Sequence, residues 1–496
     1  MIQAPSPSHG TGRSVSLSRP TRAETVAYYQ LSLIEIDERI RNLEVRCDLL
    51  RYKIDGWCAW SVLRPWLFHV LLKVLRKASQ SRQWYGRPIM AICDLVRLAG
   101  LRETHYLVKT YTSALLEPEG NMFKDIWVDD LLRQIGSFQK IESVNNPLFL
   151  HRRKNALIRS DITSTLFESI AAILAAHGGS KQVSSIANAL ATVLHKEFGE
   201  EIFTKQFVAR RLSRFLWQKR LYGLMLRKVR PRCVIVGGPG EYALVAAAKE
   251  QSIKVVELQH GYIDRYHSAY SWTRYALAQK AEMPIPDLLF LYGEFWKDEL
   301  DVHGFWGDAL RVVGSLRMDE YRQRGVERWN EQEYNLVVTS TGIDVDRVVD
   351  FLERFLIESA EKVPVRLSIK LHPVNDRDMT PYVAAFRQDP RVTIIAANEN
   401  PTTYQLLACA DLHVSISSTC HCEALGLGVP TAILPFTFHE QFLVLHEKGF
   451  AFLVESPKEL LELLKNAKTQ RISADVGEYF FKSGALTKMK SELAMC

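Results

Sequence analysis

One turn near the middle of the chain carries a carboxylate and an imidazole close together. Glu257 and His260 are three residues apart, and they come at the end of Lys254–Leu258, whose apolar pattern predicts a buried strand. Such a pair can do general-base work, because one group takes a proton while the other orients it. Gly261 allows a ligand to approach the backbone closely. We expect a catalytic turn, with the base left open between Glu257 and His260. Two more polar residues of this loop are expected on the acceptor side, Asp264 and His267.

Three further turns, each after a predicted strand, carry hydroxyls or an imidazole. Thr339–Gly342 and Ser415–Thr419 combine small hydroxyls with the start of a helix, an arrangement that can bind an anion such as phosphate. Lys370–Pro373 ends in an imidazole that proline holds at a strand tip. N-capping alone would explain one hydroxyl but not the series. The turns predict a nucleotide site formed by Ser340, Thr341, His372, Pro373, Ser417, Ser418, Thr419 and Glu423, the last placed to reach ribose hydroxyls.

Several familiar cofactor and metal motifs are missing from the sequence. It contains no GxxxxGK(S/T) loop, and Gly237–Gly240 is not a complete GxGxxG fingerprint. Cys420, His421 and Cys422 stand too close together for the usual spacing of zinc ligands, so we interpret them as the start of a helix. No DxD stands in the catalytic turns. We therefore expect a reaction that needs neither a metal ion nor a cofactor.

Apolar segments of strand length alternate with helical segments on both sides of residue 300. Cys233–Gly238 and Lys254–Leu258 flank an alanine-rich helix over Gly240–Gln251, and this compact unit predicts a parallel sheet. Residues 88–230 are expected to be mostly helical, with one strand near His105–Tyr111. The pattern predicts an α/β fold of two Rossmann-like lobes, which bind ligands at the carboxyl ends of their strands. In the second lobe, strands are expected at 334–340, 365–371, 391–395, 412–416 and 431–434.

Length and composition fit a globular protein with two lobes. The chain has 496 residues, of which 47% are hydrophobic and 24% charged, and this is ordinary globular composition. The net charge of +7 comes from the first 100 residues, so no basic face is expected along the body and no nucleic-acid partner. We divide the chain into a disordered leader (1–25), an acceptor lobe with a helical extension (26–300), a nucleotide-binding lobe (301–470) and a final helix that packs back on the first lobe (471–496).

The region after the leader allows two interpretations. Tyr28–Lys53 has helical apolar spacing, and the aromatic, basic segment Trp57–Lys77 follows it. That segment is either a buried helix with a basic exposed edge or a helix that lies on a membrane surface. No run of about 20 apolar residues is present to span a membrane, and the eight scattered cysteines suit a reducing compartment. We expect a cytoplasmic protein, with peripheral contact to the inner membrane through this basic helix as the alternative.

In order and spacing, the four polar turns resemble those of bacterial GT-B glycosyltransferases of capsule and lipopolysaccharide assembly. The similarity covers about residues 230–470, and the closest groups use CMP- or CDP-activated donors: the sialyl-, Kdo and polyol-phosphate transferases. His372-Pro373 and Ser417–Thr419 resemble the motifs that hold the cytidine nucleotide in the first two groups. His260-Gly261 is similar to the His-Gly of polyol-phosphate polymerases. Two further likenesses are Glu423-Ala with Gly428-Val-Pro430, similar to a ribose-binding turn, and Val313-Gly314-Ser315 with Asp319, similar to an interlobe segment.

The resemblance implies a metal-independent glycosyltransferase with a nucleotide-sugar donor and a glycan or lipid-linked acceptor. Related sugar transferases more often use a carboxylate as the base, which favours Glu257. The acidic Asp/Glu-Asp/Glu-Gly motif of the sialyltransferases is missing, so His260 stays open. Two alternatives remain: a CDP-glycerol-type polyol-phosphate transferase, and a non-catalytic GT-B-like protein that binds carbohydrate or acts as a scaffold.

Overall fold

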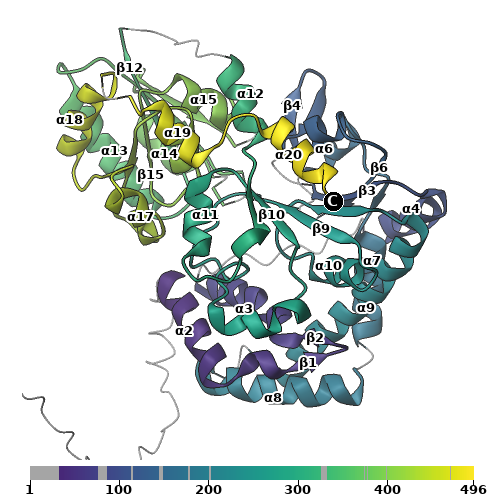
Figure 1. The fold of residues 1–496 in the computed structure, drawn as a ribbon. Helices are drawn as coiled ribbons and strands as arrows, with labels where there is room; N and C mark the ends of the chain where they lie inside the picture. Colours follow the sequence, from purple (N-terminus) through teal and green to yellow (C-terminus); the bar gives the residue numbers. More distant parts are fainter. Residues whose placement is uncertain are drawn as a thin grey trace, which may run out of the picture.

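Two parallel sheets, one in each lobe, form the body of the computed structural model (Figure 1). The structure describes residues 33–75, 87–112, 116–144, 149–176, 179–199, 203–324, 332–373, 375–376, 378–397, 399–469 and 471–496. The leader expected over 1–25 lies outside these residues. The α/β fold with two Rossmann-type lobes and a helical N-terminal extension is confirmed.

The first lobe is built on a seven-stranded parallel sheet with the order β11-β10-β9-β8-β3-β6-β7. Its strands are β3 (Tyr106–Tyr111), β6 (Phe138–Ser143), β7 (Ile162–Thr163), β8 (Cys233–Val236), β9 (Lys254–Leu258), β10 (Leu288–Leu291) and β11 (Leu310–Val312). One face packs against α7 (Thr165–Ala176), α9 (Lys205–Val229) and α10 (Tyr242–Lys249). The other packs against α5 (Asp129–Leu132) and the C-terminal α20 (Ala485–Ala494).

The first lobe holds more strands than its sequence predicts. Between residues 88 and 230, β6 and β7 join the expected β3, and β4 (Leu116–Glu119) forms a hairpin with β5 (Met122–Asp125). Polar residues interrupt the apolar pattern of β6, so the sequence did not predict this strand. Lys140 is buried in β6 and pairs with Asp129 at 2.9 Å. The sheet also continues to Val312, beyond the boundary expected at residue 300.

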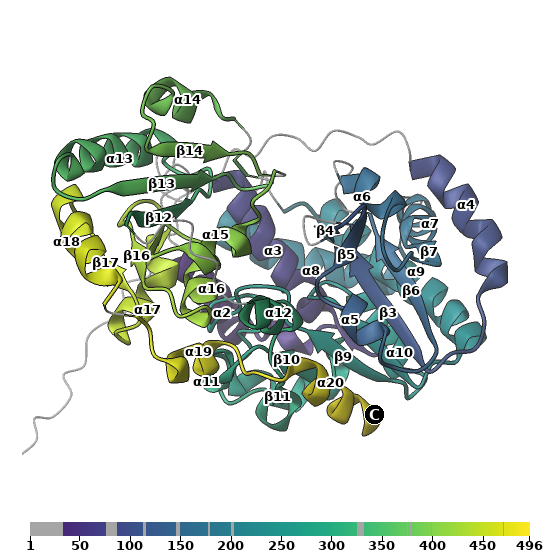
Figure 2. The same ribbon diagram turned by 90° about the horizontal axis from the view of Figure 1, so that it is seen from above.

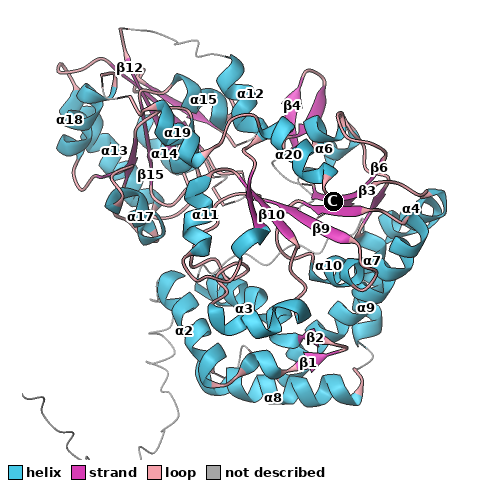
Figure 3. Cartoon of the chain, viewed as in Figure 1, coloured by secondary structure: helices cyan, strands magenta, loops and turns pink. Residues whose placement is uncertain are grey.

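The second lobe has a six-stranded parallel sheet with the order β14-β13-β12-β15-β16-β17. Its strands are β12 (Tyr334–Thr339), β13 (Val365–Lys370), β14 (Val392–Ile395), β15 (Leu412–Ser415), β16 (Thr431–Ile433) and β17 (Phe452–Leu453). The five strands predicted here are confirmed, and β17 is additional. Figure 3 shows helices on both faces of the sheet. One face packs against α13 (Val345–Ser359), α14 (Thr380–Phe386) and α18 (Pro457–Ala467), and the other against α15 (Thr403–Cys409) and α16 (Cys420–Gly426).

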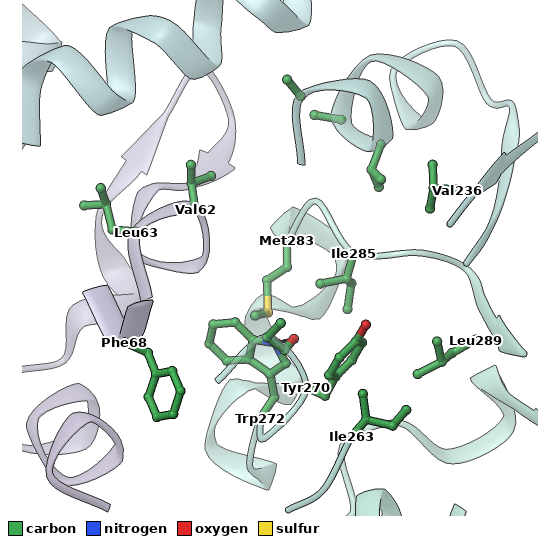
Figure 4. Close-up of a cluster of buried hydrophobic side chains, with 14 of the residues drawn as sticks. Val62, Leu63, Phe68, Val236, Ile263, Tyr270, Trp272, Met283, Ile285 and Leu289 are labelled. Atoms are coloured by element: carbon green, nitrogen blue, oxygen red, sulfur yellow. Dashed lines mark hydrogen bonds between the residues drawn. The ribbon is translucent and has the colours of Figure 1, made fainter. Parts of the chain in front are cut away.

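The helical extension packs against the first lobe through a buried core. It contains α2 (Leu33–Arg46), the short hairpin β1 (Lys53–Ile54) and β2 (Trp57–Cys58), α3 (Ala59–Leu75) and α8 (Lys181–Phe198). Figure 4 shows Val62 and Leu63 of α3 in the same apolar cluster as Tyr270 and Trp272 of the first lobe. The buried interpretation of this segment is confirmed as far as Leu71.

Arg64, one of the basic residues of that segment, lies inside the extension rather than on an exposed edge. It is fully buried, 4.2 Å from the centroid of the Trp272 ring, and it donates to Ser271 Oγ at 2.7 Å. The carboxylates of Asp37 and Glu44 lie 3.5 Å away. The membrane-surface interpretation is therefore wrong for this part of the helix, while Arg76 and Lys77 lie outside the described residues. None of the helices within the described ranges has the length and apolar character needed to cross a bilayer.

The chain passes between the lobes twice. Val313–Ser315 leads from the first lobe to α12 (Leu316–Arg324), and residues 481–484 lead back from α19 (Ala474–Phe480) to α20 (Figure 2). The two crossings touch, because a Cβ at Gly314 would lie 2.0 Å from the carbonyl oxygen of Lys482. Gly314 also has a φ of +96°, which favours glycine. The helix expected over 471–496 is thus two helices with a crossing between them.

Candidate functional site

The strand order of the second sheet reverses between β12 and β15. β12 pairs with β13 on one side and with β15 on the other, in parallel both times. In open parallel sheets, a ligand crevice lies outside the carboxyl ends of the strands at such a reversal. Ser340 and Thr341 follow β12, and Ser417–Thr419 follow β15. The two predicted hydroxyl turns therefore meet at this reversal.

A cavity of about 330 Å³, called here the donor cavity, opens at this reversal. Side chains from three strand ends of the second lobe line it, and the first lobe adds Arg152 with Glu117 and Pro118 of the β4–β5 hairpin. It therefore lies between the lobes. All the residues predicted to bind the nucleotide line it: Ser340, Thr341, His372, Pro373, Ser417, Ser418, Thr419 and Glu423.

The hydroxyl groups after β12 are held differently from one another. Ser340 Oγ hydrogen-bonds Tyr382 Oη at 2.7 Å and donates to the carboxylate of Asp376. Thr341 Oγ1 is buried and has no hydrogen-bond partner among the described residues. A buried hydroxyl without a partner is costly. A polar ligand in the donor cavity would satisfy Thr341, whereas Ser340 is already occupied in shaping the turn.

An imidazole and a cation stand at the end of β13. His372 Nδ1 accepts the N–H of Asn375 at 3.0 Å, which holds the ring at the strand tip. Lys370 is buried behind it, and its Nζ donates to the carbonyls of Ala396 at 2.9 Å and Glu399 at 2.6 Å. Burial lowers the pKa of Lys370 to about 8. Lys370 therefore carries a positive charge in most molecules at pH 7.

Arg317, near the start of α12, brings a second cation to the cavity. Its guanidinium pairs with Glu117 and lies 3.6 Å from the centroid of the Tyr404 ring. Burial disfavours the charge, but Glu117 offsets this and the pKa of Arg317 is raised. Its Nε is buried without a hydrogen-bond partner among the described residues. The sequence analysis did not select Arg317, although the interlobe motif Val313–Ser315 ends two residues before it.

A second cavity, of about 130 Å³ and called here the acceptor cavity, adjoins the first. Arg317, Thr419 and Glu423 line both cavities. The order of the first sheet also reverses, between β3 and β8, and the glycines after β8 bring the backbone close to His260. A Cβ at Gly238 would lie 3.1 Å from the His260 ring. Aromatic side chains supply much of the remaining wall: Trp127, Tyr292, Trp296, Tyr404 and Phe481.

The two groups expected to share the base role face different spaces. His260 lines the acceptor cavity, whereas Glu257 lines a separate small space of about 10 Å³ in the first lobe. Burial raises the pKa of Glu257 to about 8, against the lowering effect of the hydrogen bond that Tyr270 Oη donates to it. Glu257 is therefore mostly protonated at pH 7. The structure therefore does not place an ionised Glu257 carboxylate where it could reach the same hydroxyl as His260.

Asp264 and His267, expected on the acceptor side, are not among the residues that line these three cavities. Asp264 is buried, its Oδ1 accepts the N–H of Tyr266 at 2.9 Å, and burial raises its pKa to about 7. The His267 ring lies 4.8 Å from the Tyr270 ring and 6.1 Å from the His260 ring, measured between centroids. Both residues thus support the loop that carries His260.

The Cys420-His421-Cys422 cluster begins α16, as interpreted from its spacing. His421 is buried, and its Nδ1 hydrogen-bonds Thr431 Oγ1 at 2.7 Å. Burial lowers the pKa of His421 to about 3, so the ring is neutral. Within the part of the chain that the structure describes, no group of three or more His, Cys, Asp or Glu side chains could hold a metal ion.

Comparison with known proteins finds similar folds but no match to a family. No family model matches the sequence, and no curated protein matches it. A putative UDP-N-acetylglucosamine 2-epimerase from Listeria monocytogenes is similar in structure, with a TM-score of 0.50 and 13% identity over 79% of this chain and 98% of that one. A UDP-GlcNAc 2-epimerase from Neisseria meningitidis, bound to UDP-GlcNAc, reaches 0.48 and 16% over 79% and 99%. The calicheamicin glycosyltransferase CalG4 reaches 0.43 and 14% over 80% and 96%.

The Listeria structure shares the arrangement of both lobes with this chain. Together with the two reversed parallel sheets, it shows a GT-B-like fold.

Proposed function

We propose that this protein is a glycosyltransferase that moves a sugar from a cytidine-activated donor to a surface-polysaccharide or lipid-linked acceptor. The observation that carries the proposal is the pair of adjoining cavities, one at the strand-order reversal of the second sheet and the other at the ends of β9 and β10 in the first. Arg317, Thr419 and Glu423 line both cavities, so a donor in one would present its sugar to the other. Group transfer needs the reacting atoms of two substrates to be held together in this way.

The donor cavity supports a phosphate-containing ligand. It combines the cations Lys370 and Arg317 with the hydroxyls of Thr341 and of Ser417–Thr419. Charge-assisted hydrogen bonds from such groups suit phosphate oxygens. Its volume of about 330 Å³ is within the range of small-molecule pockets. We assign the cytidine nucleotide to His372-Pro373 and Ser417–Thr419, on the resemblance of these motifs to those of CMP-donor transferases. We assign its ribose to Glu423, on the resemblance of Glu423-Ala and Gly428–Pro430 to a general GT-B ribose-binding turn.

The acceptor cavity supports an acceptor hydroxyl beside a general base. A neutral imidazole that faces the cavity can accept a proton from an acceptor hydroxyl. Glu257 already holds its own proton at neutral pH, so we assign the base to His260. In the reaction, His260 takes the hydroxyl proton while the acceptor oxygen bonds to the anomeric carbon of the sugar. The bond from that carbon to the phosphate oxygen breaks, and Arg317 stabilises the negative charge of the departing nucleotide.

A donor panel tests this function. The protein is incubated with glycan acceptors and CMP-sialate, CMP-Kdo, CDP-glycerol or UDP-GlcNAc, and CMP release and product mass are measured. We expect turnover with a cytidine donor. His260→Ala should lower turnover about 100- to 10,000-fold with donor affinity kept, whereas His372→Ala and Ser418→Ala should weaken donor affinity. Ser473→Ala is the matched control for Ser418→Ala, because Ser473 only caps α19.

One observation favours a second candidate within the same site. His260-Gly261 is similar to the His-Gly of polyol-phosphate polymerases, and such an enzyme would transfer glycerol phosphate from CDP-glycerol. Both candidates release CMP, so the mass of the product separates them. If the protein neither binds a nucleotide nor turns over any donor of the panel, both candidates are contradicted. That result would support a non-catalytic carbohydrate-binding protein.

A further inference from the structure

The helix α4 (Arg87–Gly100) carries apolar side chains on the side that faces solvent. Ile89, Ile92, Leu95 and Val96 are between 60% and 73% exposed. On a helix, residues three, four and seven apart share a face. Ile89, Ile92 and Val96 therefore form one row with Leu95 at its edge, and these four residues are called here the α4 strip. Elsewhere in the described ranges, the only large exposed apolar side chains this close along the chain are the pair Tyr275 and Leu277.

The opposite side of α4 is fixed to the first lobe, where Leu98 packs against the apolar core. Asp94 is buried there, and its carboxylate accepts the backbone N–H of Thr163 at 2.8 Å and the hydroxyl of the same residue. At the end of the helix, Lys228 Nζ donates to the carbonyl of Ala99 at 2.8 Å. A surface helix of a soluble protein normally turns polar residues toward solvent, so the outward apolar side chains of α4 are unusual. These bonds hold the α4 strip outward, at the outer edge of the first lobe (Figure 2).

Basic side chains gather near the C-terminal end of the α4 strip. Arg97 and Arg102 are exposed, and so are Lys228 and Arg230 at the end of the neighbouring α9. Glu103 lies in the same group, where it pairs with Arg230 at 2.7 Å. Four cations against one carboxylate leave the border of the strip positive. An apolar face with a cationic border matches an anionic bilayer, where acyl chains lie beneath negatively charged headgroups.

We propose that the α4 strip docks on an anionic lipid surface. A second copy of the chain fits the strip less well for two reasons. A helix of 14 residues is about 21 Å long and about 10 Å wide. One of its faces therefore covers about 210 Å², well below the roughly 800 Å² that each partner buries in a stable interface. The positive borders of two copies would also repel each other. The proposal concerns α4 and not the buried part of α3, and it does not depend on transferase activity.

Vesicle co-sedimentation of the full chain tests the proposal without any substrate. The vesicles are phosphatidylcholine alone, or phosphatidylcholine with phosphatidylglycerol, at low and high salt. We expect binding to the anionic vesicles that salt weakens. Ile92→Gln/Val96→Gln should lower the partition coefficient about tenfold or more, because two exposed apolar side chains lose their burial in the bilayer. Arg97→Gln/Arg102→Gln should lower it about fivefold for each arginine removed.

A matched double variant and two further measurements decide between the outcomes. Val302→Gln/Ile357→Gln removes two exposed apolar side chains outside the strip and should bind like the wild type. If the wild type binds neither vesicle, or if Ile92→Gln/Val96→Gln binds as well as the wild type, the proposal is overturned. A melting temperature that this strip variant lowers by several degrees, without vesicle binding, would show that another segment of the chain covers the strip. A dimer by light scattering that the same variant abolishes, again without vesicle binding, would show that a second copy does.

Discussion

Replacing Arg317 by glutamine tests the proposed contact with the donor phosphate. Glutamine keeps a hydrogen-bonding side chain but removes the charge. A hydrogen bond to a charged group contributes about 1.5–3 kcal/mol, and each 1.4 kcal/mol is tenfold in affinity. We therefore expect CMP to bind about 10- to 150-fold more weakly. The upper part of that range applies because Arg317 pairs with Glu117 in the wild type, and the variant leaves that carboxylate facing the phosphate.

Isothermal titration with CMP measures the effect, with melting temperatures on the same samples. Arg324→Gln is the matched control, because this arginine is on the same helix but its side chain is 53% exposed and pairs with Glu320. Glu117→Gln should bind CMP as tightly as the wild type or more tightly, since Arg317 loses a competing partner. The double variant Glu117→Gln/Arg317→Gln removes the whole ion pair and should bind less tightly than Glu117→Gln. CMP affinity within twofold of the wild type for both Arg317 variants would refute the assignment.

Three further changes test the electrostatics and the crossing between the lobes. Burial raises the pKa of Glu257 from 4.5 to about 8. Between these pH values Glu257 keeps its proton in the native state and loses it in the unfolded state. The free energy of unfolding of the wild type therefore falls as pH rises, by at most about 1.4 kcal/mol per pH unit from this group. Glu257→Gln should lose less over that window in urea titrations at pH 5 to 8, and parallel curves would contradict the buried carboxyl. Arg64→Leu leaves the buried Glu44 without its cation and Asp37 with Arg41 alone, and should cost about 3–5 kcal/mol in urea unfolding. A loss below about 1 kcal/mol would mean that the Arg64 charge is dispensable. Gly314→Ala forces a Cβ onto the carbonyl of Lys482, so it should lower the melting temperature and expose the second crossing to protease. Gly449→Ala is the control, because Gly449 also has a positive φ but has open space around it. This variant should change the melting temperature and the protease sensitivity much less.

The second lobe could be predicted from sequence because its strands are short apolar runs that end in polar turns. Leu336–Val338 and Leu412–Val414 are buried in the sheet, and the hydroxyls follow at their carboxyl ends. Parallel pairing then brings those ends together, which is why one cavity contains every predicted nucleotide residue. In the first lobe, β6 was not predicted because Lys140 interrupts its apolar pattern. The carboxylates that neutralise Lys140 are neighbours through the fold, and no local pattern shows them.

The site itself was predictable only where residue type and strand position were enough. An arginine near the start of a helix looks like an ordinary surface charge, and Arg317 becomes notable only when the fold brings Glu117, 200 residues away, to it. The pairing of Glu257 with His260 failed for a different reason. Glu257 still belongs to β9 and points into the lobe, whereas His260 lies beyond the strand end. Protonation of Glu257 depends on that burial, which its neighbours in sequence do not reveal.

The double crossing between the lobes means that the first lobe is not a single continuous stretch of chain, whereas the second lobe is one insert within it. Met489 and Leu493 of α20 share an apolar cluster with Val256 of β9, so the last residues are part of the first lobe's core. A fragment cut at residue 315 would leave that cluster open to water. The second lobe could instead be exchanged as one insert, residues 316–480, with both junctions placed where Gly314 meets Lys482. A chimaera built with one junction would exchange part of the acceptor lobe's core along with the donor lobe.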